Sequence, residues 1–170
     1  MPKISLRKYR MSDLDRMCEL FIDKRVLANF PGLDVKNVTR KIEKKWIKDT
    51  IGDYNRKKPE SMNMAIIADG MYVGGIGMDH ISYANEKAEI GYFIDHEYWG
   101  KGYATEALRQ FLKLLFKRFK FKRIEGHAFS HNTGSQKVML KNGLKYEGEK
   151  KKAIKKNGKF YNQKFYAITK

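Results

Sequence analysis

The residues with the clearest chemical potential form a glycine-containing loop between a strand-like run and an amphipathic helix. The strand-like run covers residues 87–95, and apolar residues at helical spacing begin at Ala104. Glycines let a ligand approach the backbone closely, and the first N–H groups of a helix can bind an anion. The sequence therefore predicts a phosphate-binding loop made of Trp99, Gly100, Lys101, Gly102, Tyr103, Ala104 and Thr105. A glycine-rich helix entry without a ligand is the alternative interpretation.

Two common nucleotide motifs do not fit this loop. A dinucleotide-binding fingerprint requires G-x-G-x-x-G, but Thr105 stands where the third glycine belongs. A G-x-x-x-x-G-K-[ST] phosphate loop does not occur in the chain. The loop therefore matches neither of these two nucleotide-binding motifs.

A carboxylate lies in the strand that leads into the loop. Strand alternation places Glu89, Gly91 and Phe93 on one face and the apolar Ala88 and Ile90 on the other. Glu89 is accordingly the candidate for accepting a proton from an amine, directly or through water. The alternative is a structural carboxylate that pairs with a nearby lysine.

Asn132 and Ser135 open a second helix, expected over residues 132–141. Asn132 is the predicted N-cap, and Ser135 is a small residue in the first turn. The histidines and Cys18, the only cysteine, do not follow a metal-ligand spacing, so we expect no metal site. Cys18 lies in an amphipathic segment and is expected to be a buried structural thiol.

The remaining elements are read from periodicity and turn signals. Helices are expected from Ser12, the predicted N-cap, and over residues 34–51, where Val35, Val38, Ile42, Trp46 and Ile47 form the apolar stripe. Asp69-Gly70 and Asn157-Gly158 are predicted turns. Strands are expected over residues 4–9, 62–68, 71–80, 87–95, 123–128, 144–154 and 159–168.

Composition limits the class of protein. The 170 residues suit one domain, expected over 1–170, and no apolar run is long enough to cross a bilayer, so a cytoplasmic protein is expected. The formal net charge is +17, and residues 137–170 hold eleven lysines but only two acidic residues. This excess fits either a solvated lysine-rich surface or attraction to a polyanion such as ribosomal RNA or the phosphates of a cofactor.

Three motifs carry a family resemblance. Residues 99–104 resemble the pyrophosphate loop Q/R-x-x-G-x-G/A of the GNAT acyltransferases, with Gly102 and Ala104 at the small positions and Trp99 in place of Gln or Arg. Residues 132–144 resemble the family's N-x-x-S-x-x-V-x-x-K-x-G-F helix, and residues 157–162 resemble its late hairpin. The full loop is similar to that of the RimJ/RimL branch, which acetylates ribosomal-protein N-termini.

The resemblance implies a single-domain α+β fold with a mixed, mostly antiparallel sheet flanked by helices, and acetyl-CoA as cofactor. It implies that the main chain of Phe93 and Ile94 contacts the pantetheine where two strands splay, with one N–H facing the thioester oxygen. It also places Asn132 against the cofactor and Ser135 near its sulfur, as a donor to the leaving thiolate. Met139 stands where many members have a tyrosine that protonates the leaving thiolate, and methionine cannot donate a proton.

The expected function is acetyl transfer from acetyl-CoA to a primary amine by direct attack in a ternary complex. A protein or peptide N-terminal α-amine is the leading acceptor. The alternatives are a small amine, namely a polyamine, an aminoglycoside or an amino acid, and a CoA-binding or RNA-associated module without turnover. Residues 34–61 and the late hairpin are expected to form the acceptor site. The sequence does not indicate an oligomeric state.

Overall fold

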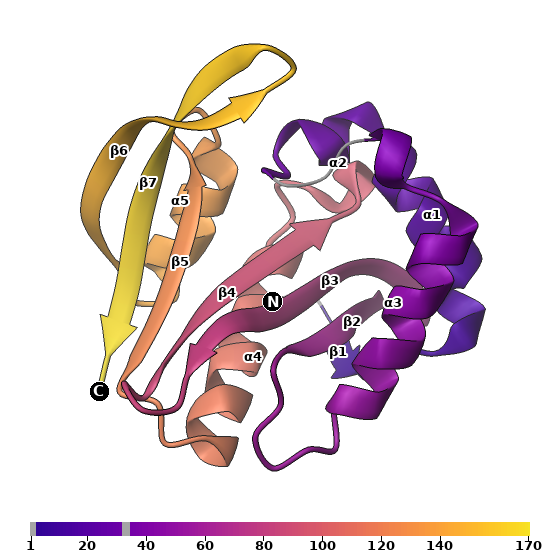
Figure 1. The fold of residues 1–170 in the computed structure, drawn as a ribbon, viewed down its shortest axis with the longest axis horizontal. Helices are drawn as coiled ribbons and strands as arrows, with labels where there is room; N and C mark the ends of the chain where they lie inside the picture. The colour runs from indigo at the N-terminus through magenta and orange to yellow at the C-terminus, as the bar shows by residue number, and fades with distance from the viewer. Residues whose placement is uncertain (1–2, 32–34) are drawn as a thin grey trace.

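A mixed sheet is the centre of the computed structural model, which describes residues 3–31 and 35–170 (Figure 1). Within these residues the sheet has seven strands in the order β1-β2-β3-β4-β5-β7-β6. Neighbouring strands are antiparallel except β4 and β5, which are parallel. The strands are β1 (Ile4–Arg7), β2 (Met62–Ala68), β3 (Met71–Ser82), β4 (Lys87–Ile94), β5 (Arg123–Phe129), β6 (Lys145–Lys156) and β7 (Lys159–Thr169). The predicted α+β class with a mostly antiparallel sheet is confirmed.

Helices cover both faces of this sheet. The helices are α1 (Leu14–Ile22), α2 (Lys24–Ala28), α3 (Arg40–Asp53), α4 (Tyr103–Arg118) and α5 (Thr133–Lys141). The short α2 was not expected from the sequence, since five residues show no clear helical period. None of the helices in the described residues is long and apolar enough to span a membrane.

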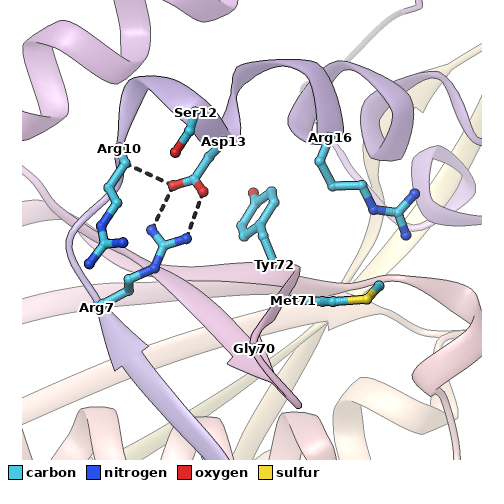
Figure 2. A pocket seen from close by; sticks show the side chains of 8 residues that line it. All are labelled: Arg7, Arg10, Ser12, Asp13, Arg16, Gly70, Met71 and Tyr72. Atoms are coloured by element: carbon cyan, nitrogen blue, oxygen red, sulfur yellow. Dashed lines mark hydrogen bonds and ion pairs between the residues drawn. The ribbon is translucent and has the colours of Figure 1, made fainter.

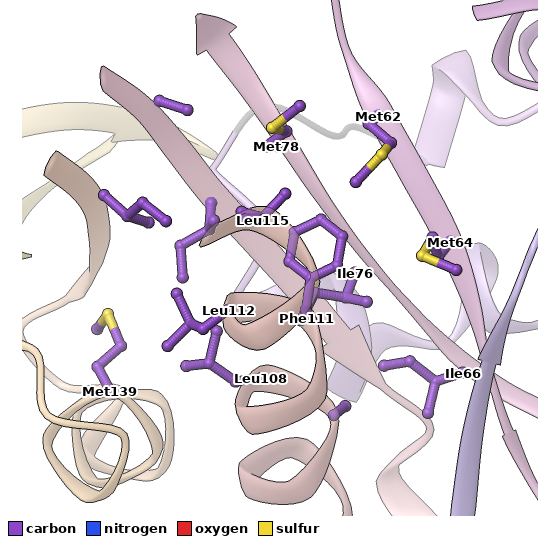
Figure 3. Packing of buried hydrophobic residues seen from close by; sticks show 14 of the residues in the cluster. Met62, Met64, Ile66, Ile76, Met78, Leu108, Phe111, Leu112, Leu115 and Met139 are labelled. Atoms are coloured by element: carbon purple, nitrogen blue, oxygen red, sulfur yellow. The ribbon is translucent and has the colours of Figure 1, made fainter. Parts of the chain in front are cut away.

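The largest apolar cluster lies between the sheet and α4 and α5. Figure 3 shows Leu108, Phe111 and Leu115 of α4 pointing toward the methionines and isoleucines of β2 and β3. Each of these three side chains is fully buried, as the helical stripe predicts. A second cluster on the opposite face packs α1 and α3 against the sheet around Met17 and Ile47. Cys18 lies only partly buried beside this second cluster, so its predicted burial is incomplete.

The alternation predicted for β4 is confirmed, and it determines on which face of the sheet each side chain lies. Ala88, Ile90 and Ile94 belong to the cluster under α4 and α5. Phe93 packs on the opposite face, with the second cluster. Glu89 therefore lies on the α1 side of the sheet, because it shares its face with Phe93.

The N-cap predicted for the first helix is wrong. Ser12 does not cap the first helix; instead the Asp13 carboxylate accepts a hydrogen bond of 2.8 Å from the Arg10 backbone N–H and two of 2.7 Å from Arg7. Asp13 is the N-cap residue of α1, but its carboxylate makes no capping bond to that helix, because it is held by the bidentate guanidinium of Arg7.

The helix expected over 34–51 is interrupted. A single 3-10 turn covers Val35–Asn37, and α3 then begins after its N-cap Thr39, whose hydroxyl accepts from the Ile42 N–H. Val35 in the 3-10 turn is exposed. Within α3, Ile42 is exposed while Ile47 is fully buried, because side chains five residues apart point to different faces of a helix. Asp34, the predicted start, lies outside the described residues.

Both predicted hairpin turns are present. Asp69 and Gly70 have φ values of 49° and 81°, and Asn157 and Gly158 have 49° and 76°, as a two-residue turn between antiparallel strands requires. The second turn joins β6 and β7 at the sheet edge. The exposed lysines of β6 protect that edge from pairing with another chain.

Candidate functional site

A gap between β4 and β5 is the feature around which the candidate residues gather. The two parallel strands pair only from Lys87 to Ile90 and from Arg123 to Gly126. Beyond that point β4 pairs only with β3, and β5 pairs only with β7, so the strands diverge (Figure 1). The predicted splay is therefore present. It leaves main-chain groups along the facing edges of β4 and β5 available to a ligand.

The predicted phosphate loop enters α4 with the backbone shape that anion binding needs. Gly100 and Gly102 have φ values of 72° and 85°, a region that favours glycine. Gly102 is the N-cap of α4, no side chain caps the helix, and the first helical hydrogen bond runs from Glu106 N–H to the Gly102 carbonyl. The N–H groups of Tyr103, Ala104 and Thr105 precede that bond and are free of helical partners. The loop thus fits a pyrophosphate.

Trp99 and Lys101 are held by the loop itself. The Trp99 indole N–H donates to the Ile94 carbonyl at 2.8 Å, which ties the loop to the end of β4. The Lys101 ammonium donates to the Glu97 carbonyl at 2.9 Å and lies 5.9 Å from the Tyr98 ring centroid. The Ile94 carbonyl is therefore already engaged, and the Lys101 charge is turned back onto its own loop.

Glu89 has a histidine as its partner. His127 Nε2 lies 2.6 Å from Glu89 Oε1, and the Gln163 side-chain nitrogen lies 2.6 Å from His127 Nδ1. No lysine pairs with Glu89 in the part of the chain that the structure describes, so the partner is a histidine and not the lysine of the structural alternative. The hydrogen bond from His127 lowers the pKa of Glu89 below its usual value, against the opposing effect of burial. Sequence reasoning missed His127, and the only available signal was its position within a predicted strand.

The face of β3 adds two further polar groups. A register shift after Asp79 places His80 at a φ of 44°, and its Nδ1 lies 3.6 Å from Glu89 Oε1. One potential ligand atom each from Asp79, His80 and Glu89 lies within 4.8 Å of the others, which the sequence spacing had not suggested. Asp79 and His80 are largely exposed, and we assign no metal here. The expected absence of a metal stays a prediction.

Asn132 and Ser135 occupy the other side of the sheet. The Asn132 side-chain oxygen accepts a 3.1 Å hydrogen bond from the Ser135 N–H, which confirms the predicted N-cap. The Tyr92 hydroxyl donates to the Ser135 carbonyl at 3.0 Å and also lies 3.0 Å from Ser135 Oγ. Burial raises the pKa of Tyr92, so its phenol is neutral. Tyr92 was not predicted as a site residue, because the contact joins two distant segments.

Met139 belongs to the core. It is fully buried, and its sulfur packs beneath Gly126 of β5, 3.0 Å from the position of an added Cβ (Figure 3). Many members of the family have at this position a tyrosine that acts as a general acid. In this chain the position holds a methionine that only packs in the core. Ser135 and Tyr92 are the hydroxyls brought together at this end of α5.

The α1–α2 segment and the late hairpin approach each other above the gap. Phe93 of β4 contacts Phe21 and Phe30, with ring centroids 4.9 and 5.7 Å apart. The Lys156 ammonium at the hairpin tip donates to the carbonyls of Leu27 and Phe30. This cation lies at the C-terminal end of α2, where it is favoured by the helix dipole.

Part of the segment expected to help form the acceptor site, residues 54–56, lies at the far end of α4 from the phosphate loop. The carbonyls of Tyr54 and Arg56 accept hydrogen bonds from Arg118, at the C-terminal end of α4. This helix has 16 residues, so its two ends are roughly 24 Å apart. Residues 54–56 therefore lie far from Gly102, while the acceptor site expected over residues 34–61 and the late hairpin stays a prediction.

A surface hollow of about 390 Å³ lies near the turn between β2 and β3 (Figure 2). Arg7, Arg10 and Arg16 line it, but Arg7 is paired bidentately with Asp13, and Arg16 is paired with Asp95. The hollow does not contain Glu89, Ser135 or the loop glycines. The chemistry-bearing residues are therefore concentrated at the splay instead.

A splayed parallel pair, a glycine loop at a helix N-terminus and a half-buried carboxylate together fit an acyltransferase-type site. The sequence pattern described as "Acetyltransferase (GNAT) domain" matches residues 3–145. The chain belongs to the GNAT acetyltransferase family and is an N-acetyltransferase of that family.

Two relatives match nearly the whole chain. An uncharacterized N-acetyltransferase p20 of Bacillus licheniformis is 26% identical over 171 residues, which cover 99% of this chain and 93% of that protein. A putative ribosomal N-acetyltransferase, YdaF, of Bacillus subtilis is 25% identical over 169 residues, which cover 98% and 91%. Both are similar to this chain along its full length.

Solved structures share the fold at lower identity. RimL, a ribosomal L7/L12 alpha-N-protein acetyltransferase in complex with coenzyme A, has a TM-score of 0.87 at 20% identity, covering 99% of this chain and 95% of that chain. A spermidine N-acetyltransferase SpeG chimera from Vibrio cholerae and hSSAT has a TM-score of 0.83 at 18% identity, covering 98% and 95%. At these identities both likenesses show the fold alone.

Proposed function

We propose that this chain transfers the acetyl group of acetyl-CoA to the N-terminal α-amine of a protein or peptide. The observation that carries the proposal is the arrangement of groups around the splay. Glu89 and His127 lie on the α1 face, and Tyr92 and Ser135 lie on the α5 face. A reacting carbonyl held in the gap would have a proton acceptor on one side and a proton donor on the other.

The cofactor would be held first by backbone. The N–H groups at the start of α4 would bind the pyrophosphate, supported by the positive end of the helix dipole. The unpaired edge of β4 at Phe93 and Ile94 would hold the pantetheine by main-chain hydrogen bonds, using groups other than the Ile94 carbonyl that Trp99 occupies. Acetyl-CoA supplies, when bound, a thioester and a thiolate leaving group.

Glu89 would handle the proton of the acceptor. Its Oε1 is bonded to His127, and the hydrogen bonds among the described residues leave Oε2 without a protein partner. Oε2 is thus available to take a proton from the α-ammonium, directly or through one water. A backbone N–H of β4 would stabilise negative charge on the carbonyl oxygen.

Ser135 would serve the leaving group. The hydrogen bond that the Ser135 N–H donates to the Asn132 side-chain oxygen fixes the first turn of α5, and Tyr92 orients the Ser135 hydroxyl. Ser135 Oγ would then donate to the departing sulfur, a role for which Met139 is chemically unsuited.

An α-amine acceptor is favoured over a polyamine by charge and by the relatives. The formal net charge of +17 disfavours encounter with a polycation. A relative of nearly full-length similarity is called a putative ribosomal N-acetyltransferase, and the RimL neighbour acts on ribosomal L7/L12. The same charge leaves association with ribosomal RNA open as a further expectation.

The test is kcat/KM with acetyl-CoA for a panel of N-terminal peptides and for spermidine, at low and moderate salt. Each peptide has a matched control with a blocked N-terminus and an internal lysine. We expect only free N-termini to be acetylated and Glu89→Gln to lower turnover by roughly 10²- to 10⁴-fold. Spermidine exceeding every peptide tenfold, about 1.4 kcal/mol of transition-state preference, would overturn the acceptor assignment. Tight CoA binding without turnover of any amine would favour a non-catalytic module.

A further inference from the structure

Three strands contribute to one chain of hydrogen bonds that crosses the mouth of the splay. It runs from Gln163 of β7 through His127 of β5 to Glu89 of β4, and both links are 2.6 Å long. The backbones of β4 and β5 are no longer paired at His127. The side-chain link therefore joins two strands at the point where their main chains separate.

The partners at the two ring nitrogens select one form of His127. The Gln163 amide nitrogen is a donor, so Nδ1 of His127 accepts and carries no hydrogen. The remaining ring hydrogen is then on Nε2, which donates it to Glu89 Oε1. Gln163 is itself buried, and the His127 ring packs against Phe165 at 5.8 Å, so the imidazole is held on both sides.

We propose that His127 is a positioning residue for Glu89: it fixes the carboxylate through Oε1 and leaves Oε2 open to the acceptor, in a tautomer selected by Gln163. This role rests on the proposed acetyl transfer. It adds two residues to the reaction that neither the sequence motifs nor the family resemblance indicate. His127 and Gln163 act through Glu89 and need not touch the acceptor.

Other charges around His127 come from several strands. Asp79 and His80 of β3 lie beside Glu89. Glu125 of β5 is already paired with Arg123 and Lys87, and Lys150 of β6 lies 4.5 Å from the Phe165 ring centroid. Of these groups, only His80 comes close enough to be a second donor to Glu89. Its Nδ1 lies 3.6 Å from Glu89 Oε1, and the His80 side chain is largely exposed. His80 is thus the natural control for a charge effect without a fixed hydrogen bond.

The sign of the pH effect follows from the hydrogen bond. A base acts when it is deprotonated, so activity is lost as pH falls through the pKa of Glu89. The His127 hydrogen bond lowers that pKa, and its removal therefore moves the acid limb of kcat/KM to higher pH. A purely structural contact would lower stability and leave the limb where it is.

The experiment compares His127→Phe, His127→Gln and His80→Asn with the wild type in complete pH profiles. We expect His127→Phe to lower kcat roughly 10- to 100-fold with a smaller change in KM, the effect of one hydrogen bond to a charged group, and to raise the acid limb. His127→Gln, which keeps an N–H donor, should recover part of the loss. His80→Asn should shift the limb less than His127→Phe.

A second readout does not depend on turnover. The ¹⁵N shifts of the His127 ring should indicate the Nε2–H tautomer in the wild-type protein and a mixture in Gln163→Met. An Nδ1–H tautomer in the wild type, or pH profiles of His127→Phe and wild type that coincide, would overturn the proposal. Absence of turnover in the wild type would instead count against the proposed function, while the tautomer measurement would still decide the role of Gln163.

Discussion

Gly102 offers the most direct test of the phosphate loop. It is the N-cap of α4 with a φ of 85°. A residue with a Cβ is strained there by about 1–2 kcal/mol, so Gly102→Ala should be less stable by that amount. In Gly102→Asp a carboxylate would also lie near the expected pyrophosphate. Two like charges about 4 Å apart repel by ~1 kcal/mol in water and ~4 kcal/mol at an effective dielectric constant of 20.

The two consequences are measured separately. Strain belongs to the protein without ligand and is read from thermal unfolding. Repulsion belongs to the complex, and we take about 2 kcal/mol, a value between these two, which is roughly 30-fold in the Kd for acetyl-CoA by calorimetry. The matched control is Gly70→Ala, because Gly70 has a φ of 81° with nothing within 4 Å of an added Cβ.

Gly70→Ala should lose stability and retain its affinity for acetyl-CoA. Gly102→Asp should lose both. If Gly102→Asp binds acetyl-CoA as tightly as the control does, the pyrophosphate does not lie on this loop, and the reasoning from the α4 N-terminus is refuted.

Two other sets of variants test the leaving-group side and the acceptor side. Ser135→Ala should lower kcat, and Tyr92→Phe should lower it by roughly 2- to 12-fold, because it removes one neutral hydrogen bond that orients Ser135. Single-turnover rates measure both, and rates equal to the wild type would identify water as the proton donor. Lys156→Ala should raise KM for a peptide while leaving the Kd for acetyl-CoA unchanged, since Lys156 holds the hairpin to the carbonyls of Leu27 and Phe30. A changed Kd with an unchanged KM would contradict an acceptor role for the hairpin.

The features predicted correctly from sequence are those that depend on neighbours along the chain. The α4 stripe, the Asn132 cap and the Asn157-Gly158 turn each depend on residues within about four positions. Backbone geometry fixes such relations whatever the rest of the fold does. The N-cap predicted at Ser12 was also local, but it failed. Asp13 is the N-cap residue instead, and its carboxylate is paired with Arg7 of β1, a contact that the local sequence does not show.

The pairing of the candidate site residues was decided only by tertiary structure. Glu89 and His127 are 38 positions apart, and they meet because β4 and β5 are parallel with Glu89 opposite Glu125. Alternation within each strand specifies the face on which Glu89 and His127 lie, but a register shift of two residues would keep that face and separate the two side chains. Tyr92 and Ser135, 43 positions apart, meet because α5 packs on the face of the sheet to which Tyr92 points. The sequence alone indicated most of the elements, the loop and the family, whereas long-range packing determined which groups face one another across the splay.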